Sequence, residues 1–95
     1  MSMLDFYNIT FEKADNSKQM VIKGEVKNNS GRNYNAVAIR VVLFNKNIPV
    51  VSTVVVVNGV PNGSTKSFEK FVEEIEYEEV AKSINRQEAY IESAY

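Results

Sequence analysis

The chain has neither cysteine nor histidine among its 95 residues. Without cysteine it can build no disulfide framework and no thiolate metal site. Without histidine it lacks the usual acid–base group of neutral pH and the commonest protein ligand of transition metals. We therefore predict that the chain is not an enzyme and that it carries no cofactor.

Long apolar runs are also missing. None exceeds four residues, the length of Val54–Val57, whereas a membrane helix needs about 20 apolar residues. The first residues, Met1–Asp5, show no basic region followed by an apolar stretch, so they do not resemble a signal peptide. The sequence thus predicts no membrane span and no signal peptide in this chain, and it leaves the compartment open.

The chain also lacks an excess of positive charge. The net charge is −1 and the isoelectric point is about 5.4. The charge is uneven, because seven basic and four acidic residues precede Lys66, whereas four basic and eight acidic residues follow from there. No surplus remains to neutralise a phosphate backbone, so nucleic acid is not an expected partner.

The sequence is rich in valine, and apolar residues alternate with polar ones along much of it. Hydrophobic residues make up 44% of the chain, which is typical of a soluble globular protein, and the length suits a single domain over residues 1–95. Period-two alternation predicts β-strands, which branched and aromatic side chains favour. Gly24 inside the second strand predicts a bulge or a close backbone approach. The expected strands cover 7–12, 20–27, 36–44, 50–57 and 88–95.

One stretch allows two interpretations. The apolar residues at positions 68, 71, 72 and 75 have the spacing of a helical stripe. The same residues fit a strand if a bulge near Glu69 and Lys70 resets the register. Residues 76–85 carry good helix formers and predict a short helix.

These elements together predict an all-β fold, a two-sheet β-sandwich of six or seven strands with at most one short helix near 76–85. Its core should contain the inward-facing residues of the alternating segments. They are Ile9, Ile22, Val26, Val37, Ile39, Val41, Leu43, Val54, Val56 and Phe68.

The middle of the chain resembles the FxLYD domain family. The resemblance runs from Ile22 to Phe68 and rests on the segment 24–30, on Tyr34, on residues 41–45 and on the turn at 61–64. In the naming motif Val41 stands at the Phe position, Leu43 is kept, Phe44 replaces Tyr and Asn45 replaces Asp. The stretch is more distantly similar to the water-stress type of late-embryogenesis-abundant domain.

The resemblance implies an immunoglobulin-like sandwich without enzymatic activity. It also implies an accessory or protein-interaction module of a bacterial or archaeal surface protein, and hence an extracytoplasmic location. The family has no established site residues to carry over.

Candidate contact residues come from the strand pattern and from exposed aromatics. Val55 and Val57 belong to an apolar, β-branched run. At a sheet edge this run could pair with a strand of another chain, whereas at a sheet centre it would simply be part of the core. Tyr34 lies in a loop region and Phe44 at a strand end, where aromatic residues either anchor interfaces or close the ends of a core. A protein partner, this chain itself or another, is therefore expected to bind through a sheet edge or loops.

The alternative function is metal-dependent binding or hydrolysis by the acidic C-terminal segment. Clustered carboxylates are what Ca²⁺ and Mg²⁺ prefer, but no glycine-containing calcium loop accompanies them. A solvated acidic face is the competing interpretation. The residues concerned are Glu73, Glu74, Glu76, Glu78 and Glu79.

Overall fold

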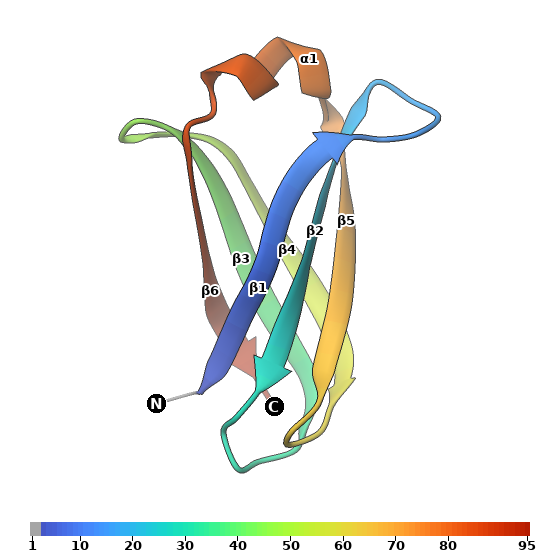
Figure 1. Ribbon diagram of the computed structural model, residues 1–95, viewed down its shortest axis with the longest axis vertical. Helices are drawn as coiled ribbons and strands as arrows, with labels where there is room; N and C mark the ends of the chain where they lie inside the picture. Colours follow the sequence, from blue (N-terminus) through green and yellow to red (C-terminus); the bar gives the residue numbers. More distant parts are fainter. Residues whose placement is uncertain (1–2) are drawn as a thin grey trace.

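A computed structural model describes residues 3–95, which form six β-strands and a short helical cap (Figure 1). This confirms the predicted all-β fold and the predicted short helix. The strands are β1 (Leu4–Lys13), β2 (Gln19–Asn28), β3 (Tyr34–Asn45), β4 (Ile48–Val60), β5 (Thr65–Glu76) and β6 (Arg86–Ala94); the cap consists of α1 (Tyr77–Val80) and the 3₁₀ turn η1 (Ala81–Ser83).

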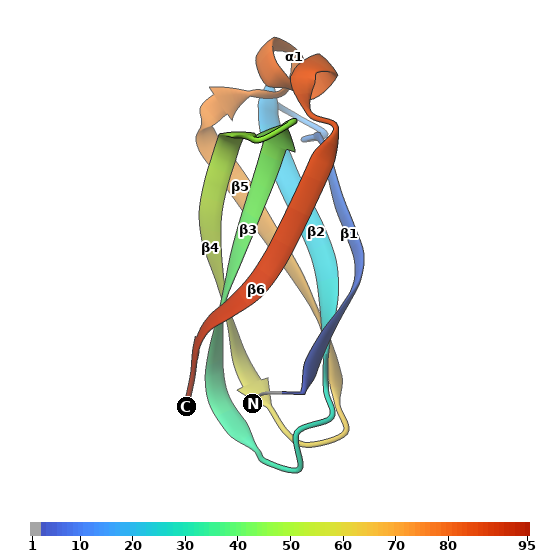
Figure 2. The ribbon, with the colours of Figure 1, turned by 90° about the vertical axis from the view of Figure 1, so that its left-hand side faces the viewer.

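The strands form two antiparallel sheets of three within the described residues, in the orders β1-β2-β5 and β4-β3-β6. The hairpins β1–β2 and β3–β4 each stay inside one sheet, while the other three connections cross between the sheets. Figure 2 shows the second sheet face-on, with β3 between β4 and β6. The two-sheet sandwich is thus confirmed, and its immunoglobulin-like identity stays a prediction.

The core lies between the sheets and contains seven of the ten residues predicted for it: Ile22, Val26, Val37, Ile39, Val41, Leu43 and Phe68. Ile9 packs against this core but is only partly buried. Burial of such side chains is the main favourable term in folding.

The prediction was wrong for Val54 and Val56. Val54 is partly exposed, Val56 is 57% exposed, and their neighbour Val55 faces the core. The reason is the register with β3, in which the inward-facing Ile39 stands opposite Val55. A shift of one residue in a strand moves every side chain to the other face, and a run of four valines carries no local signal that fixes this choice.

The ambiguous stretch 68–76 is strand. Its ladder with β2 is regular from Thr65 to Val72, and the irregularity lies between Val72 and Glu76 rather than near Glu69 and Lys70. Phe71 therefore points outward and is 48% exposed, and the extra residues bring Ile75 back against the core. The irregularity between Val72 and Glu76 changes the alternation of the strand, and this is why its apolar residues have the spacing of a helix.

Gly24 lies at a close backbone approach, as its place in a strand predicted. In β1, Asn8 and Ile9 fall between the paired residues Tyr7 and Thr10, so they form a bulge opposite Gly24. Asn8 takes a positive φ of 53°, which Asn tolerates better than most residues. A Cβ at Gly24 would stand 2.5 Å from Cδ1 of Ile9 and 2.6 Å from Cζ of Phe68.

Gly24→Ala should therefore destabilise the fold by about 1–3 kcal/mol, because the added methyl group overpacks the site. Urea unfolding followed by circular dichroism measures the change. Ile9→Val removes the Cδ1 atom, so the cost of Gly24→Ala should be smaller in that background. Equal costs in both backgrounds would show that Ile9 does not limit the space.

The end of the sandwich opposite the cap is closed by Asn28, which is 0% exposed. Its Nδ2 donates to the carbonyl oxygens of Arg32 and Val60, at 2.7 and 2.9 Å. Its Oδ1 accepts from the backbone N–H and the hydroxyl of Ser30, at 2.9 and 2.6 Å. The buried amide is thus fully bonded, as such groups need to be, and it joins the loop 29–33 to β4.

Two further asparagines hold the loop 29–33 to the turn 61–64. The backbone N–H of Asn62 donates to Oδ1 of Asn33 at 2.9 Å, and Oδ1 of Asn62 accepts from the N–H of Gly31 at 3.0 Å. The loop 29–33 is therefore part of a hydrogen-bonded network that fixes two of the crossings between the sheets.

Candidate protein-interaction surface

The outer margin of β4 is the strongest candidate for a functional surface. Within the described part of the chain β4 pairs only with β3, so its other side is an open sheet edge (Figure 2). The strand is 13 residues long and contains no charged residue. Its ladder is regular from Val51 to Val60, after an irregularity around Val50. The sequence allowed the apolar run 50–57 to lie either at a sheet edge or at a sheet centre, and the structure places it at an edge.

The outward side chains of β4 make an apolar strip next to this edge. Val56 is 57% exposed and Val54 is partly exposed, and both lie next to the exposed Ser52. Ile48, which is 67% exposed, stands opposite Asn45 beyond the irregularity at Val50 and so falls on the other face of the strand. On β3, Ala38 stands opposite Val56 and extends the strip by one small side chain. We call Val54, Val56 and the open margin of residues 51–57 the β4 edge.

Arg40 crosses the outer face of this sheet and ties its three strands together. It lies on β3, its Nε donates to Oε1 of Glu92 on β6 at 2.7 Å, and its Nη1 donates to Oγ of Ser52 on β4 at 3.0 Å. The hydrogen bond to Glu92 raises the pKa of Arg40 above its ordinary value, against the opposing effect of desolvation. The charge next to the β4 edge is therefore already paired.

The four contact residues predicted from the sequence do not come together. Val55 and Val57 are 5% and 8% exposed and lie in the core, so the outward valines of this strand are Val54 and Val56. Tyr34 and Phe44 lie near opposite ends of β3, about 33 Å apart at the rise of an extended strand. Both are partly buried, and Tyr34 packs against the core.

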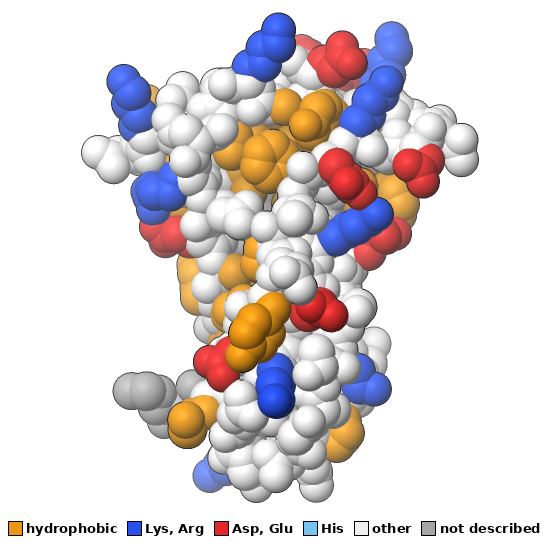
Figure 3. All heavy atoms as spheres, in the orientation of Figure 1, with side chains coloured by type: hydrophobic (Ala, Val, Ile, Leu, Met, Phe, Trp, Pro, Cys, Tyr) orange, Lys and Arg blue, Asp and Glu red, His pale blue; other side chains and the backbone are white. Residues whose placement is uncertain are grey.

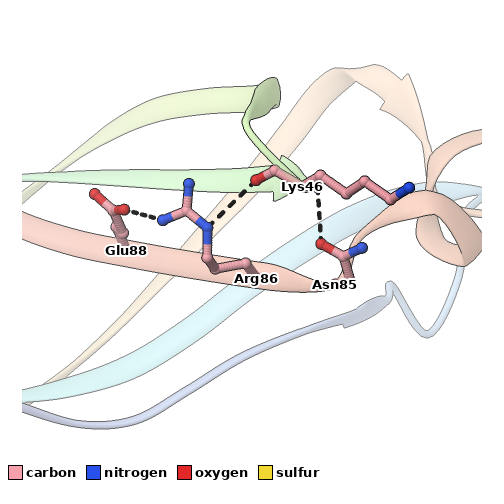
Figure 4. Close-up of polar contacts among 4 residues, drawn as sticks. All are labelled: Lys46, Asn85, Arg86 and Glu88. Carbon is pink, nitrogen blue, oxygen red and sulfur yellow. Dashed lines mark hydrogen bonds and ion pairs between the residues drawn. The ribbon is translucent and has the colours of Figure 1, made fainter.

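Phe44 belongs to a polar cluster at the β3–β4 turn. The guanidinium carbon of Arg86 lies 3.9 Å from the centre of the Phe44 ring. Arg86 also pairs with Glu88 and donates from Nε to the carbonyl oxygen of Lys46 at 3.3 Å (Figure 4). Asn85 accepts at Oδ1 from the N–H of Lys46 at 2.9 Å. The cluster holds the turn against the start of β6, and one face of the Phe44 ring is occupied.

Hydrophobic side chains also gather at the surface beneath the helical cap (Figure 3). Phe11 and Tyr77 contribute there, with ring centres 6.3 Å apart. An open hollow beside them is lined by residues 77, 78, 81 and 82. Phe11 and Tyr77 pack against the cap end of the core and are partly buried.

The acidic segment proposed as a metal site is spread over the end of β5 and the cap. All five of its glutamates are exposed. Among residues 3–95 no three carboxylates gather in a way that could hold a metal ion. In the same range no helix is long and apolar enough to cross a membrane.

Sequence reasoning missed the roles of Arg40 and Asn28. Arg40 had a visible signal, because it is the one charged residue in the apolar stretch 36–44. Asn28 had none, because buried and exposed asparagines look alike in an Asn-rich loop. The β4 edge was visible as an apolar run, but strand order is a long-range property that the run itself does not carry.

Comparisons with known proteins add no relative to this description. No family model, no curated protein and no solved structure matches the chain. The resemblance to the FxLYD family, with the extracytoplasmic location it implies, therefore stays a prediction.

Proposed function

We propose that the chain is a non-enzymatic accessory module that binds a protein segment by strand addition along the β4 edge. The observation that carries this is an open strand edge of regular geometry without a single charge. The unpaired N–H and C=O groups of such an edge supply affinity to an extended partner, and the alternating side chains supply specificity. The family resemblance supports the same proposal, because it implies an accessory domain of a surface protein.

The other edge strands are less suited to this role. β1 carries a bulge and β5 carries six charged residues, while β6 is paired irregularly with β3 near Ile39. Charges and bulges are the usual means of keeping an edge from pairing with other chains. β4 has neither between Val51 and Val57.

The test is a selection of extended peptides from a displayed library, followed by hydrogen exchange of the complex. A selected peptide should protect those amides of residues 51–57 that point away from β3, which are every second one. Val56→Lys should weaken its binding at least about tenfold, because the lysine adds charge and removes apolar contact at the edge. Tyr7→Lys is the matched control, since Tyr7 is 47% exposed on the edge strand of the other sheet.

The proposal fails if the selected peptides protect a different element, or if Tyr7→Lys weakens binding as much as Val56→Lys. Circular dichroism and thermal unfolding should show both variants to be folded, because both positions are about half exposed.

A further inference from the structure

The β4 edge has the features of a strand that pairs with its own copy. We propose that its occupant is a second copy of this chain, with two β4 strands antiparallel across a two-fold axis at Val54. This inference rests on the proposed function and names its partner. The resulting dimer has one continuous sheet of six strands, in the order β6-β3-β4 followed by the same strands of the copy in reverse.

The register of two paired β4 strands is compatible with this dimer. A two-fold axis at Val54 places that residue opposite itself, Ser52 opposite Val56, and Thr53 opposite Val55. Ser52, Val54 and Val56 face outward, whereas Val51, Thr53, Val55 and Val57 are buried. Outward residues then meet outward residues, as for any two-fold axis through a residue, and at Val54 all the residues that meet are uncharged. Pairs of β-branched side chains in such positions stabilise a sheet.

The absence of charged residues on β4 favours a second copy as the partner. A homodimer brings identical charges together, and the β4 strand has none to oppose. Arg40, the nearest cation on the outer face, is paired with Glu92 at 2.7 Å. The whole chain carries a net charge of only −1, so long-range repulsion between copies is small.

The surface beside β4 leaves room for a further strand. A groove lined by residues 55–58 and 66–69 runs beside the last part of β4, where the copy's strand would begin to pair. Seven paired residues span about 24 Å at the rise of an antiparallel strand. An interface of one strand edge is smaller than those of stable complexes, so the dimer should be weak, with a dissociation constant of about 1–100 µM.

The test measures association by sedimentation equilibrium from about 1 µM to 1 mM protein, which brackets the expected constant. The unaltered chain should form dimers, and hydrogen exchange should show that every second amide of residues 51–57, those pointing away from β3, becomes protected as the concentration rises. Val54→Lys should raise the dissociation constant at least about tenfold, because it opposes two lysines at the axis. Tyr7→Lys should leave the constant unchanged.

A charge exchange tests the register. Val56→Lys alone should weaken the dimer, and adding Ser52→Glu should restore it, because each new lysine then faces a new carboxylate of the copy. Positions 52 and 56 are about 13 Å apart along one strand, so this pair cannot form within a single chain. Because Arg40 donates to Ser52 at 3.0 Å, Ser52→Glu alone is the control for pairing of the new carboxylate with Arg40 of its own chain.

Three results would overturn the inference: a monomer over the whole range, a dimer that Val54→Lys leaves unchanged, or no restoration by Ser52→Glu. The peptide selection separates these failures from failure of the proposed function. A monomer whose β4 edge binds selected peptides keeps the proposed function and rejects the second copy as partner. A monomer that binds no peptide at β4 rejects both.

Discussion

Asn28→Asp should destabilise the folded chain by about 3–5 kcal/mol at pH 7, because it buries a charge with no cation beside it, although Ser30 still donates two hydrogen bonds to its other oxygen. The substitution keeps the shape of the side chain but replaces the Nδ2 donor with an oxygen. That oxygen would face the carbonyl oxygens of Arg32 and Val60, which now accept hydrogen bonds at 2.7 and 2.9 Å. Urea titration at pH 7 measures the loss.

The same variant should recover stability in acid. Burial and two facing carbonyls disfavour the carboxylate, so the pKa of the new carboxyl should be higher in the folded state than its ordinary value of about 3.9. The folded state then holds a proton that the unfolded state has released. Stability of the variant should therefore fall as pH rises above about 4 and return as pH is lowered.

Asn47→Asp is the control for Asn28→Asp, because Asn47 is exposed in the β3–β4 turn. It should change the free energy of unfolding by less than about 0.5 kcal/mol. If Asn28→Asp cost no more than this control, or if its cost did not depend on pH, the amide network would not be holding the loop 29–33 to the sandwich.

Ile39→Ala is the second substitution with a large expected effect, about 2–5 kcal/mol. Ile39 is 0% exposed in β3, which is the middle strand of its sheet, so the deleted atoms leave a cavity that neighbouring strands cannot easily fill. Val56→Ala provides the contrast on the adjoining strand. It should cost less than about 1 kcal/mol, because Val56 is 57% exposed.

Urea unfolding of both variants decides whether the inward face of this sheet has been assigned correctly. The measurements should be made at low protein concentration, so that association through β4 does not add to the stability of either variant. A cost at Val56 equal to that at Ile39 would mean that β4 turns the other face toward the core.

Alternation in the sequence predicted the strands because period two is a local property of a half-buried strand. It worked best where charged and apolar residues alternate, as around Ile22 and Val26, both of which are fully buried. It could not orient the valines of β4, because adjacent valines do not differ in polarity. There the pairing with β3 sets the face, and pairing is not visible in a short window.

In the candidate site too, some features were visible in the sequence and others depend on how the strands pair. The apolar run of β4 and the solitary Arg40 could be noticed in the sequence, whereas the edge position of the run depends on strand order. Phe44 was noticed as an aromatic residue at a strand end, but the guanidinium of Arg86 stands against its ring from 42 residues further along the chain. Contacts between distant segments of this kind need the assembled sandwich.

The strand ends have a practical consequence for attaching the molecule to a support. β1 begins and β6 ends at the same end of the sandwich, away from the helical cap (Figures 1 and 2). The C-terminal residue is held there, since the N–H of Tyr95 donates to the carbonyl oxygen of Ala36 at 3.0 Å. A biotin or a tether joined to either terminus would therefore orient the molecule in one way, with the cap pointing into solution and the long flank of β4 accessible from the side.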